Sequence, residues 1–310
     1  MTLVIGTDEA GYGPNLGPLT VAASAWEVAA GLDAAEHTLA AAVTDAVPDQ
    51  LWGDSKTIYR SGAGLDALER GVLAALGLAD LPQPPDWTSL VAAIGVLPDH
   101  SPPEHEALGS VRLPRHGQSA DGANLAAAIR GPLAVRGVRL IAIRCRLVQP
   151  AEFNALLDLG LNKSDILSSV TLDLAAALAG TVTAAMPVVI WCDRHGGRRR
   201  YASQVSRAFD TPLVSPLEET STRSRYALGG NRRIEFCVGG ESRIPVAVAS
   251  MTAKYVRELA MLAFNAHWAA RQPGLAATAG YPVDASRWWK EARAAVDAAG
   301  IGQDAVWRRA

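Results

Sequence analysis

Two apolar runs, each followed by acidic residues, most constrain how this chain can fold. Leu3-Val4-Ile5 leads into Asp8 and Glu9, and Val188 to Cys192 leads directly into Asp193. Short continuous apolar runs are typical of strands that are buried on both faces, as in parallel sheets covered by helices. Such sheets place their functional sites at the carboxyl ends of the strands. The pattern therefore predicts an α/β fold with acidic side chains gathered at one edge of the sheet.

The rest of the sequence alternates between strand and helix patterns. Further strands are expected at Leu19–Trp26, Leu140–Leu147 and Ile234–Val238. Helices are expected over residues 28–47, 64–76, 151–157, 164–179 and 246–270, with a short one between Arg200 and Phe209 and a last one ending before Gly300. Residues 80–122 contain many prolines and are expected to be irregular.

Composition and charge exclude several classes of protein. Of the 310 residues, 49% are hydrophobic and 19% are charged, which excludes general disorder and supports a large core. The net charge of −2 excludes a uniformly basic coat. A local excess remains, because Arg194 to Arg243 contains ten arginines and five acidic residues, a net +5. This stretch is the expected region of phosphate contact.

The sequence also favours a soluble, cytoplasmic protein. The charge-free stretch from Leu174 to Cys192 is long enough to suggest a membrane helix, but Pro187 interrupts it. We therefore expect a buried helix followed by a strand there. Three cysteines are too few for a disulfide framework, which suggests a reducing compartment. Asp8 and Glu9 interrupt the apolar start before a signal peptide can form.

The acidic residues are the candidate catalytic groups. Asp8, Glu9 and Asp193 follow buried strands, and Glu241 stands just before a helix. Carboxylates that converge at one edge repel one another unless a cation holds them, and hard ions such as Mg²⁺ or Mn²⁺ match oxygen ligands. Two such ions can support phosphodiester cleavage. Each acid alone could equally be a helix N-cap or a solvated loop residue.

The residues around these acids resemble the ribonuclease HII family, the type 2 branch of ribonuclease H. Asp8-Glu9-Ala10-Gly11-Tyr12-Gly13-Pro14 is similar to that family's Asp-Glu-(Ala/Val)-Gly-Arg-Gly-Pro signature. The other similar motifs follow in the family's order: Asp54-Ser55-Lys56, Val188 to Asp193, Gly239-Gly240-Glu241, Ala249-Ser250-Met251-Thr252-Ala253-Lys254 and Gly280-Tyr281-Pro282. Residues 80–138, rich in proline, and 197–235, rich in arginine, are not covered by the resemblance and are expected to be insertions in a single catalytic domain.

The resemblance implies an RNase H-like fold, with a central mixed five-stranded sheet flanked by helices. It implies a monomeric endonuclease that depends on Mg²⁺ or Mn²⁺, in a two-metal site held by Asp8, Glu9, Asp193 and Glu241. The substrate would be RNA in an RNA/DNA hybrid, or a ribonucleotide embedded in duplex DNA. Cleavage would leave a 3′-hydroxyl and a 5′-phosphate.

The resemblance also implies a set of substrate-binding residues. The backbone of Gly11-Tyr12-Gly13, with Tyr281, would read the ribose 2′-hydroxyl, a contact that distinguishes RNA from DNA. Lys56 and Lys254 would hold phosphates or steady the acids. From the charge pattern, Arg198 and Arg199 are further candidates for phosphate contact. His195 is left unassigned between a proton shuttle and no role.

Three positions depart from the family pattern, and they leave alternatives open. Tyr12 replaces the arginine between the two glycines, Glu241 replaces an aspartate, and Gly239 replaces a lysine. Tyr12 removes a fixed charge and a forked donor, which affects the expected selectivity for an RNA–DNA junction. The alternatives are a non-catalytic relative that binds nucleic acid, or a two-metal nuclease or phosphotransferase for a different nucleic acid.

Overall fold

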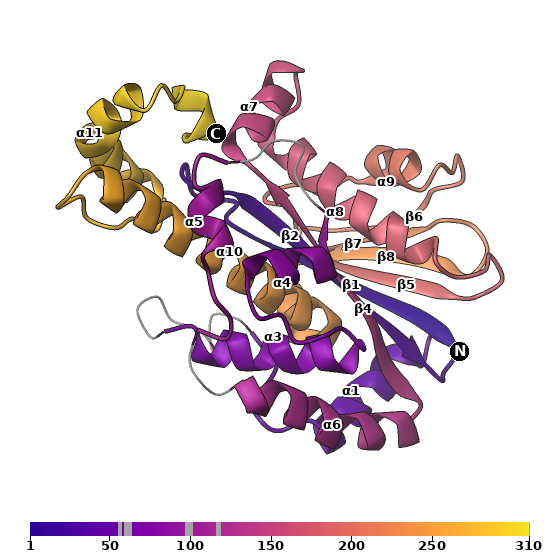
Figure 1. The fold of residues 1–310 in the computed structure, drawn as a ribbon. Coiled ribbons are helices and arrows are strands. Elements are labelled where there is room, and N and C mark those ends of the chain that lie inside the picture. Colours follow the sequence, from indigo (N-terminus) through magenta and orange to yellow (C-terminus); the bar gives the residue numbers. More distant parts are fainter. Residues whose placement is uncertain (55–57, 59–63, 97–101, 116–118, 310) are drawn as a thin grey trace.

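The protein consists of one sheet with helices packed on both faces (Figure 1). The computed structural model describes residues 1–54, 58, 64–96, 102–115 and 119–309. The sheet order is β3-β4-β2-β1-β5-β8-β7-β6. Its strands are β1 Thr2–Ala10, β2 Leu19–Val28, β3 Gly95–Val96, β4 Val138–Val148, β5 Val188–Asp193, β6 Ser215–Glu219, β7 Arg223–Ala227 and β8 Arg232–Cys237.

The mixed α/β sheet is confirmed, but the expected five strands are too few. β1, β5 and β8 are parallel to one another, whereas β2 is antiparallel to both β1 and β4. These five strands form the centre of the sheet, and three short strands extend its two edges. The additional strands β3, β6 and β7 lie within the sections 80–138 and 197–235. Their sequences, such as Ser-Pro-Leu-Glu-Glu in β6, lack the apolar alternation that signals a strand.

Among the described residues, several helices cover one face of the sheet. These are α1 Ala35–Ala46, α3 Asp66–Leu78, α4 Trp87–Ile94, α5 His105–Gly109, α6 Ser119–Val135 and α10 Ile244–Arg271. Val4 of β1 and Ala22 of β2 belong to the apolar core beneath them. Gly6 allows α10 to approach closely, because a Cβ there would lie 2.1 Å from the carbonyl carbon of Pro245. A larger residue at this position would separate α10 from β1.

The expectation that residues 80–122 are irregular is wrong for part of this section. α4 begins after Asp86, whose side chain accepts a hydrogen bond from the backbone N–H of Ser89, and α5 and α6 follow. Leu90 and Ile94 of α4 are buried in the core. Prolines at 82, 84 and 85 precede α4 rather than interrupt it, so a high density of proline here marks helix boundaries.

The opposite face is covered by α7 Pro150–Asp158, α8 Lys163–Ala179 and α9 Ala202–Ala208 (Figure 1). Leu3 and Ile5, which alternate with Val4 along β1, pack in this second core. β1 is therefore buried on both faces, as its continuous apolar sequence predicts. No helix in the described ranges is long and apolar enough to cross a membrane.

The end of the chain forms a third apolar cluster with the second half of α10. α11 Pro282–Ala298 contributes Trp288, and the following segment contributes Val306. Trp288 is fully buried against Phe264 and Trp268 of α10, as expected for a core residue. This packing brings Trp307 and Arg308 next to the turn that follows β1.

Candidate active site

The acids of β1 lie at the point where its parallel partner β5 ends. The two strands pair from Leu3 opposite Val188 to Thr7 opposite Cys192, and Asp8 and Asp193 are the next residues. On its other side β1 continues to pair with β2 as far as Ala10. The expectation that Asp8 and Glu9 follow the strand is therefore wrong, because both lie within β1. The acids stay in the strand, and it is β5 that stops.

The fourth acid, Glu241, lies in a short turn after β8. Gly240–Ser242 form a 3₁₀ turn between β8 and α10, and its Gly240 N–H donates a hydrogen bond to Oδ1 of Asp193 at 2.9 Å. The hydroxyl of Ser250, in the second turn of α10, donates to Oε1 of Glu241 at 2.9 Å. These two bonds fix Asp193 and Glu241 to the same end of the sheet as Asp8.

The four acids act on one another electrostatically. Asp8 is 6% exposed, and burial together with the charges of Glu9, Asp193 and Glu241 raises its pKa well above the usual range. Burial, followed by the charge of Asp193, raises the pKa of Glu9 to about 7. A hydrogen bond from Ser250 partly opposes the shift of Asp8. The predicted acids are thus brought together, and a bound cation would reduce the repulsion between them.

The acids match a hard cation in chemistry and charge, but they do not form a ready coordination group. Within the described residues, no three His, Cys, Asp or Glu side chains are placed so that they could hold one metal ion. Asp193 and Glu241 instead use carboxylate oxygens in the bonds to Gly240 and Ser250. Metal binding would require the carboxyl groups to come closer together than they lie here.

A pocket of about 530 Å³ opens beside two of the acids. Its lining includes Asp193, Arg194 and Glu241, together with Gly196 and Asp54. Asp54 belongs to the Asp-Ser-Lys motif, but it was not assigned a role of its own from the sequence. Its position beside Asp193 and Glu241 adds a fifth carboxylate to the site. Lys56, from the same motif, lies outside the described residues.

The Gly-Tyr-Gly turn after β1 is held by two buried arginines. Gly11 has a φ of 84°, and a Cβ there would lie 2.5 Å from Nε of Arg257, so this position requires glycine. Arg308 is fully buried and donates to the carbonyl oxygens of Gly11 and Pro14. Neither arginine was identified from the sequence, because both act through contacts with residues far along the chain.

The aromatic residues expected to bind substrate lie on this turn and next to it. Tyr281, which is 56% exposed, stands beside Gly13, where a Cβ would lie 3.7 Å from its ring. Tyr12 is half-buried near Gly196, where a Cβ would lie 3.1 Å from the Tyr12 hydroxyl. The charge of Glu9 contributes to a raised pKa of Tyr12, after burial. The turn and Tyr281 therefore form one surface that continues from the acids.

The arginines expected to contact phosphate are only partly available. Arg198 forms an ion pair with Asp165 and also donates to the hydroxyl of Ser164. The side chain of Arg199 is exposed. Carboxylates from outside the stretch balance part of the remaining positive charge, for example where Asp33 pairs with Arg233 and Glu36 pairs with Arg243. The local net charge of +5 therefore overstates the free positive surface.

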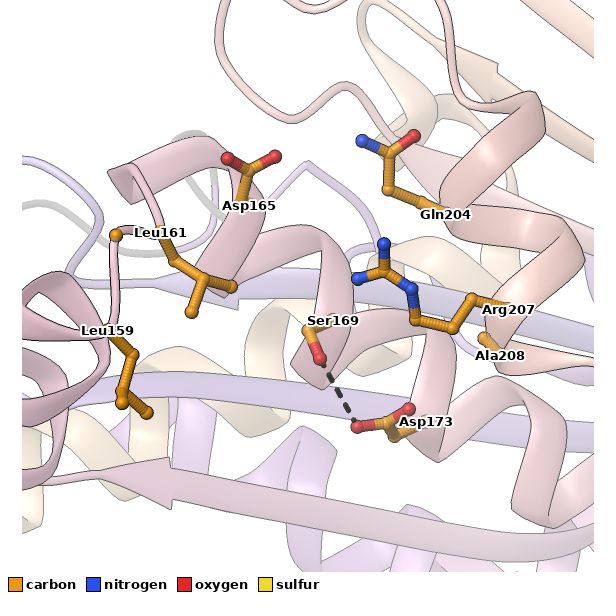
Figure 2. Close-up of a pocket in the computed structure, with 9 residues that line it drawn as sticks. Leu159, Leu161, Asp165, Ser169, Asp173, Gln204, Arg207 and Ala208 are labelled. Atoms are coloured by element: carbon orange, nitrogen blue, oxygen red, sulfur yellow. Dashed lines mark hydrogen bonds between the residues drawn. The ribbon is translucent and has the colours of Figure 1, made fainter.

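Asp165 also lines a second pocket, of about 340 Å³, between α8 and α9 (Figure 2). Figure 2 shows Asp173 accepting a hydrogen bond from Ser169, with Gln204 and Arg207 on the opposite wall. The pocket mixes two carboxylates with one guanidinium, and none of the four clustered acids lines it. It is therefore separate from the candidate active site.

His195 and Lys254 have different surroundings. His195 is 1% exposed, its Nδ1 lies 2.9 Å from the Ser168 hydroxyl, and burial lowers its pKa to about 3. A neutral, enclosed imidazole of this kind is part of the core. Lys254 lies on α10 one turn after Ser250, so both side chains project from the same face of the helix.

The comparisons with known proteins give a distant likeness of fold. No protein-family model matches the sequence, and no curated protein sequence is similar to it. Ribonuclease H2 from Pyrococcus horikoshii OT3 is similar in structure, with a TM-score of 0.49 and 14% identity over 98% of this chain and 92% of that chain. RNase HII from Archaeoglobus fulgidus, solved in complex with PCNA, gives 0.44 and 16% over 99% and 94%. Bst-RNase HIII, solved with Mn²⁺, gives 0.44 and 15% over 99% and 66%.

Proposed function

We propose that this protein is a metal-dependent endonuclease that hydrolyses RNA phosphodiester bonds in RNA/DNA hybrids or at single ribonucleotides in duplex DNA. The proposal rests on one observation, the convergence of Asp8, Glu9, Asp193 and Glu241 at the carboxyl end of β1 and β5. A partly buried cluster of four carboxylates has no evident value for stability, since each one raises the free energy of the others when ionised. All four come from one chain, so a monomer is sufficient.

The four acids would hold Mg²⁺ or Mn²⁺, and a pair of such ions can lower the pKa of a bound water and stabilise the leaving oxygen. Gly240 and Ser250 orient Asp193 and Glu241 through their hydrogen bonds. Partial burial of Asp8 and Glu9 strengthens their electrostatic interaction with a cation. Hydrolysis on this arrangement would leave a 3′-hydroxyl and a 5′-phosphate.

Recognition of RNA would fall to the turn beside the acids. Arg257 lies against Gly11 and Arg308 donates a hydrogen bond to its carbonyl, and the exposed ring of Tyr281 lies beside Gly13. A ribose that enters this space would meet backbone polar groups and an aromatic face at once. Because a 2′-hydroxyl both donates and accepts hydrogen bonds, it can be distinguished here from the hydrogen of a deoxyribose.

The test is cleavage of defined duplexes by the purified protein. One substrate is duplex DNA with a single ribonucleotide, a second is a continuous RNA/DNA hybrid, and duplex RNA and duplex DNA serve as controls. We expect cleavage of the first two with Mg²⁺ or Mn²⁺, and none with EDTA. Asp193→Asn should abolish cleavage without loss of folding, whereas Asp297→Asn, on the exposed face of α11, should leave it unchanged. Lack of metal-dependent incision on both substrates contradicts the proposal.

A second candidate function is binding of nucleic acid without turnover. Two observations favour it: Tyr12 stands where the family has arginine, and the acids of the described residues do not form a ready metal-binding group. A two-metal nuclease for another nucleic acid is the remaining alternative. Salt-sensitive binding with no product under either metal would identify the protein as a non-catalytic binder. Cleavage of duplex RNA or duplex DNA in the panel would identify it as a nuclease for another nucleic acid.

A further inference from the structure

Lys163 is the first residue of α8 and lies against the Tyr12 ring. Its Nζ is 4.8 Å from the ring centroid, within the range of a cation–π interaction. No ion pair to Lys163 occurs among the described residues, in contrast to the nearby Arg198, which pairs with Asp165. Lys163 is therefore a cation that is placed by an aromatic ring rather than neutralised by a carboxylate.

This position is unfavourable for a lysine on local grounds. The N-terminus of a helix carries partial positive charge, so acidic residues are stabilising there and basic residues are not. Asn162 and Asp165 form a capping box in the same turn, which places an acidic residue there. Lys163 lies between them and places a basic residue where the helix dipole disfavours one. Partial burial and the charge of Arg308 both lower the pKa of Lys163. Residues that break a local rule without an evident structural gain are commonly functional.

Tyr12 connects Lys163 to the acid site. The Tyr12 hydroxyl borders Gly196, which lines the same pocket as Asp193 and Glu241. After burial, the negative charge of Glu9 contributes to the raised pKa of Tyr12. A nucleic acid strand that presents one phosphate to the acids carries further phosphates on either side of it, next to this surface. A cation beside Tyr12 would be suited to neutralise one of them.

We propose that Lys163, supported by the Tyr12 ring, binds a backbone phosphate of the nucleic acid next to the four acids, so that Tyr12 and Lys163 together supply the charge that an arginine would supply at position 12. The inference rests on the proposed function for the identity of the ligand as a nucleic acid. It adds a positive charge from α8 to the charges of the Arg-rich stretch, where Arg198 is already paired with Asp165.

The experiment measures binding of a labelled RNA/DNA hybrid in EDTA as a function of KCl concentration. Removal of one phosphate contact should reduce the slope of log K against log salt by about 0.9. For Lys163→Gln we expect this reduction and a Kd raised about 5- to 10-fold at low salt, with a melting temperature equal to or above that of the wild type. Lys163→Arg should restore the slope. Lys290→Gln, an exposed lysine on α11, is the matched control and should bind like the wild type.

A second variant tests the support from the aromatic ring. Tyr12→Leu keeps an apolar side chain but removes the π face, and its slope should fall toward that of Lys163→Gln. A wild-type slope for Lys163→Gln would overturn the inference, as would equal losses in Lys163→Gln and Lys290→Gln. Because binding is measured without metal, a wild type that binds but never cleaves would contradict the endonuclease proposal and leave the phosphate contact supported.

Discussion

The hydroxyl of Ser250 donates a hydrogen bond to Oε1 of Glu241 across 2.9 Å, so that α10 orients an acid of the preceding turn. Ser250 is 3% exposed and also contributes a hydrogen bond that lowers the pKa of Asp8. One buried hydroxyl thus serves two of the four acids. The resemblance to the family's Ala-Ser-x-x-Ala-Lys motif marked the position, and its contacts explain why a hydroxyl is needed there.

Ser250→Ala should therefore reduce cleavage more than stability. A hydrogen bond to a charged group is worth about 1.5–3 kcal/mol, and 1.4 kcal/mol corresponds to a factor of ten. We expect kcat on a hybrid substrate to fall roughly tenfold or more. Ser286→Ala removes a comparable hydroxyl from α11, where it donates to the carbonyl of Pro282, and should leave kcat unchanged. Equal kcat values for Ser250→Ala and the wild type would exclude an orienting role.

The stability of the metal-free protein should decrease as pH rises from about 4.5 to 7. The pKa of Glu9 is about 7 in the folded protein against 4.5 when unperturbed, so the folded state binds more protons than the unfolded state in this window. Its contribution falls by on the order of 2–3 kcal/mol across the window. Glu9→Gln should flatten this part of the profile, measured as the urea unfolding free energy at several pH values.

Glu104 provides the control for that profile. Burial also raises its pKa to about 7, but it precedes α5 and is not part of the acid cluster. Glu104→Gln should flatten the pH profile as well, yet leave intact the rise in melting temperature on addition of Mn²⁺. Glu9→Gln should reduce that rise. The Mn²⁺ effect should be larger at pH 8 than at pH 5.5, because protonated carboxyls bind metal poorly. A pH-independent Mn²⁺ effect would contradict this assignment.

The sequence predicted the parts of the fold that depend on local pattern. β1, β5 and α10 have continuous or periodic apolar residues, and their positions follow directly. β6 and β7 could not be predicted, because they are polar and form a strand pair only by extension from the edge at β8. Asp8, Glu9 and Asp193 were found because each follows an apolar run, and Glu241 because it stands just before a helix. Their mutual repulsion depends on the register between β1 and β5, which no local pattern encodes.

The sequence could not identify residues whose role depends on distant contacts. Arg198 looked like a phosphate ligand because arginines surround it, but Asp165 lies 33 positions away and pairs with it. Lys163 was not singled out from the sequence, because its contact with the Tyr12 ring joins residues that are far apart along the chain. A charge count over one stretch does not include carboxylates that other elements place next to it. For this reason the count overestimated the free positive charge of the Arg-rich stretch.

Replacement of His195 should affect stability and not the pH dependence of cleavage. The imidazole packs edge-on against Tyr201 and Phe236, and its lowered pKa of about 3 keeps it neutral at any working pH. His195→Asn should lower the unfolding free energy by roughly 1–3 kcal/mol, through lost packing and a weakened contact with Ser168. The profile of kcat/KM against pH should keep its inflections. A displaced inflection between pH 6 and 7 would restore His195 as a proton-transfer candidate.

Arg308 should control substrate binding through the turn that it holds. It is fully buried and donates to the carbonyls of Gly11 and Pro14, almost 300 positions earlier in the chain. Arg308→Met keeps most of the volume but leaves those carbonyls without their donor, at about 1–3 kcal/mol for each buried group. We expect a lower melting temperature and a raised KM for hybrid substrates.

The neighbouring Arg309 separates this effect from a general loss of charge at the end of the chain. Arg309 pairs with Asp158 on the surface and is 44% exposed, so Arg309→Ala should cost less than about 1 kcal/mol and leave KM unchanged. Asp8 and Glu9 lie on β1, Asp193 on β5 and Glu241 in the turn before α10, whereas Arg308 donates to carbonyls of the turn after β1. The Mn²⁺-induced rise in melting temperature should therefore survive in Arg308→Met. If that rise disappears with KM unaltered, the arginine supports the acids rather than the turn.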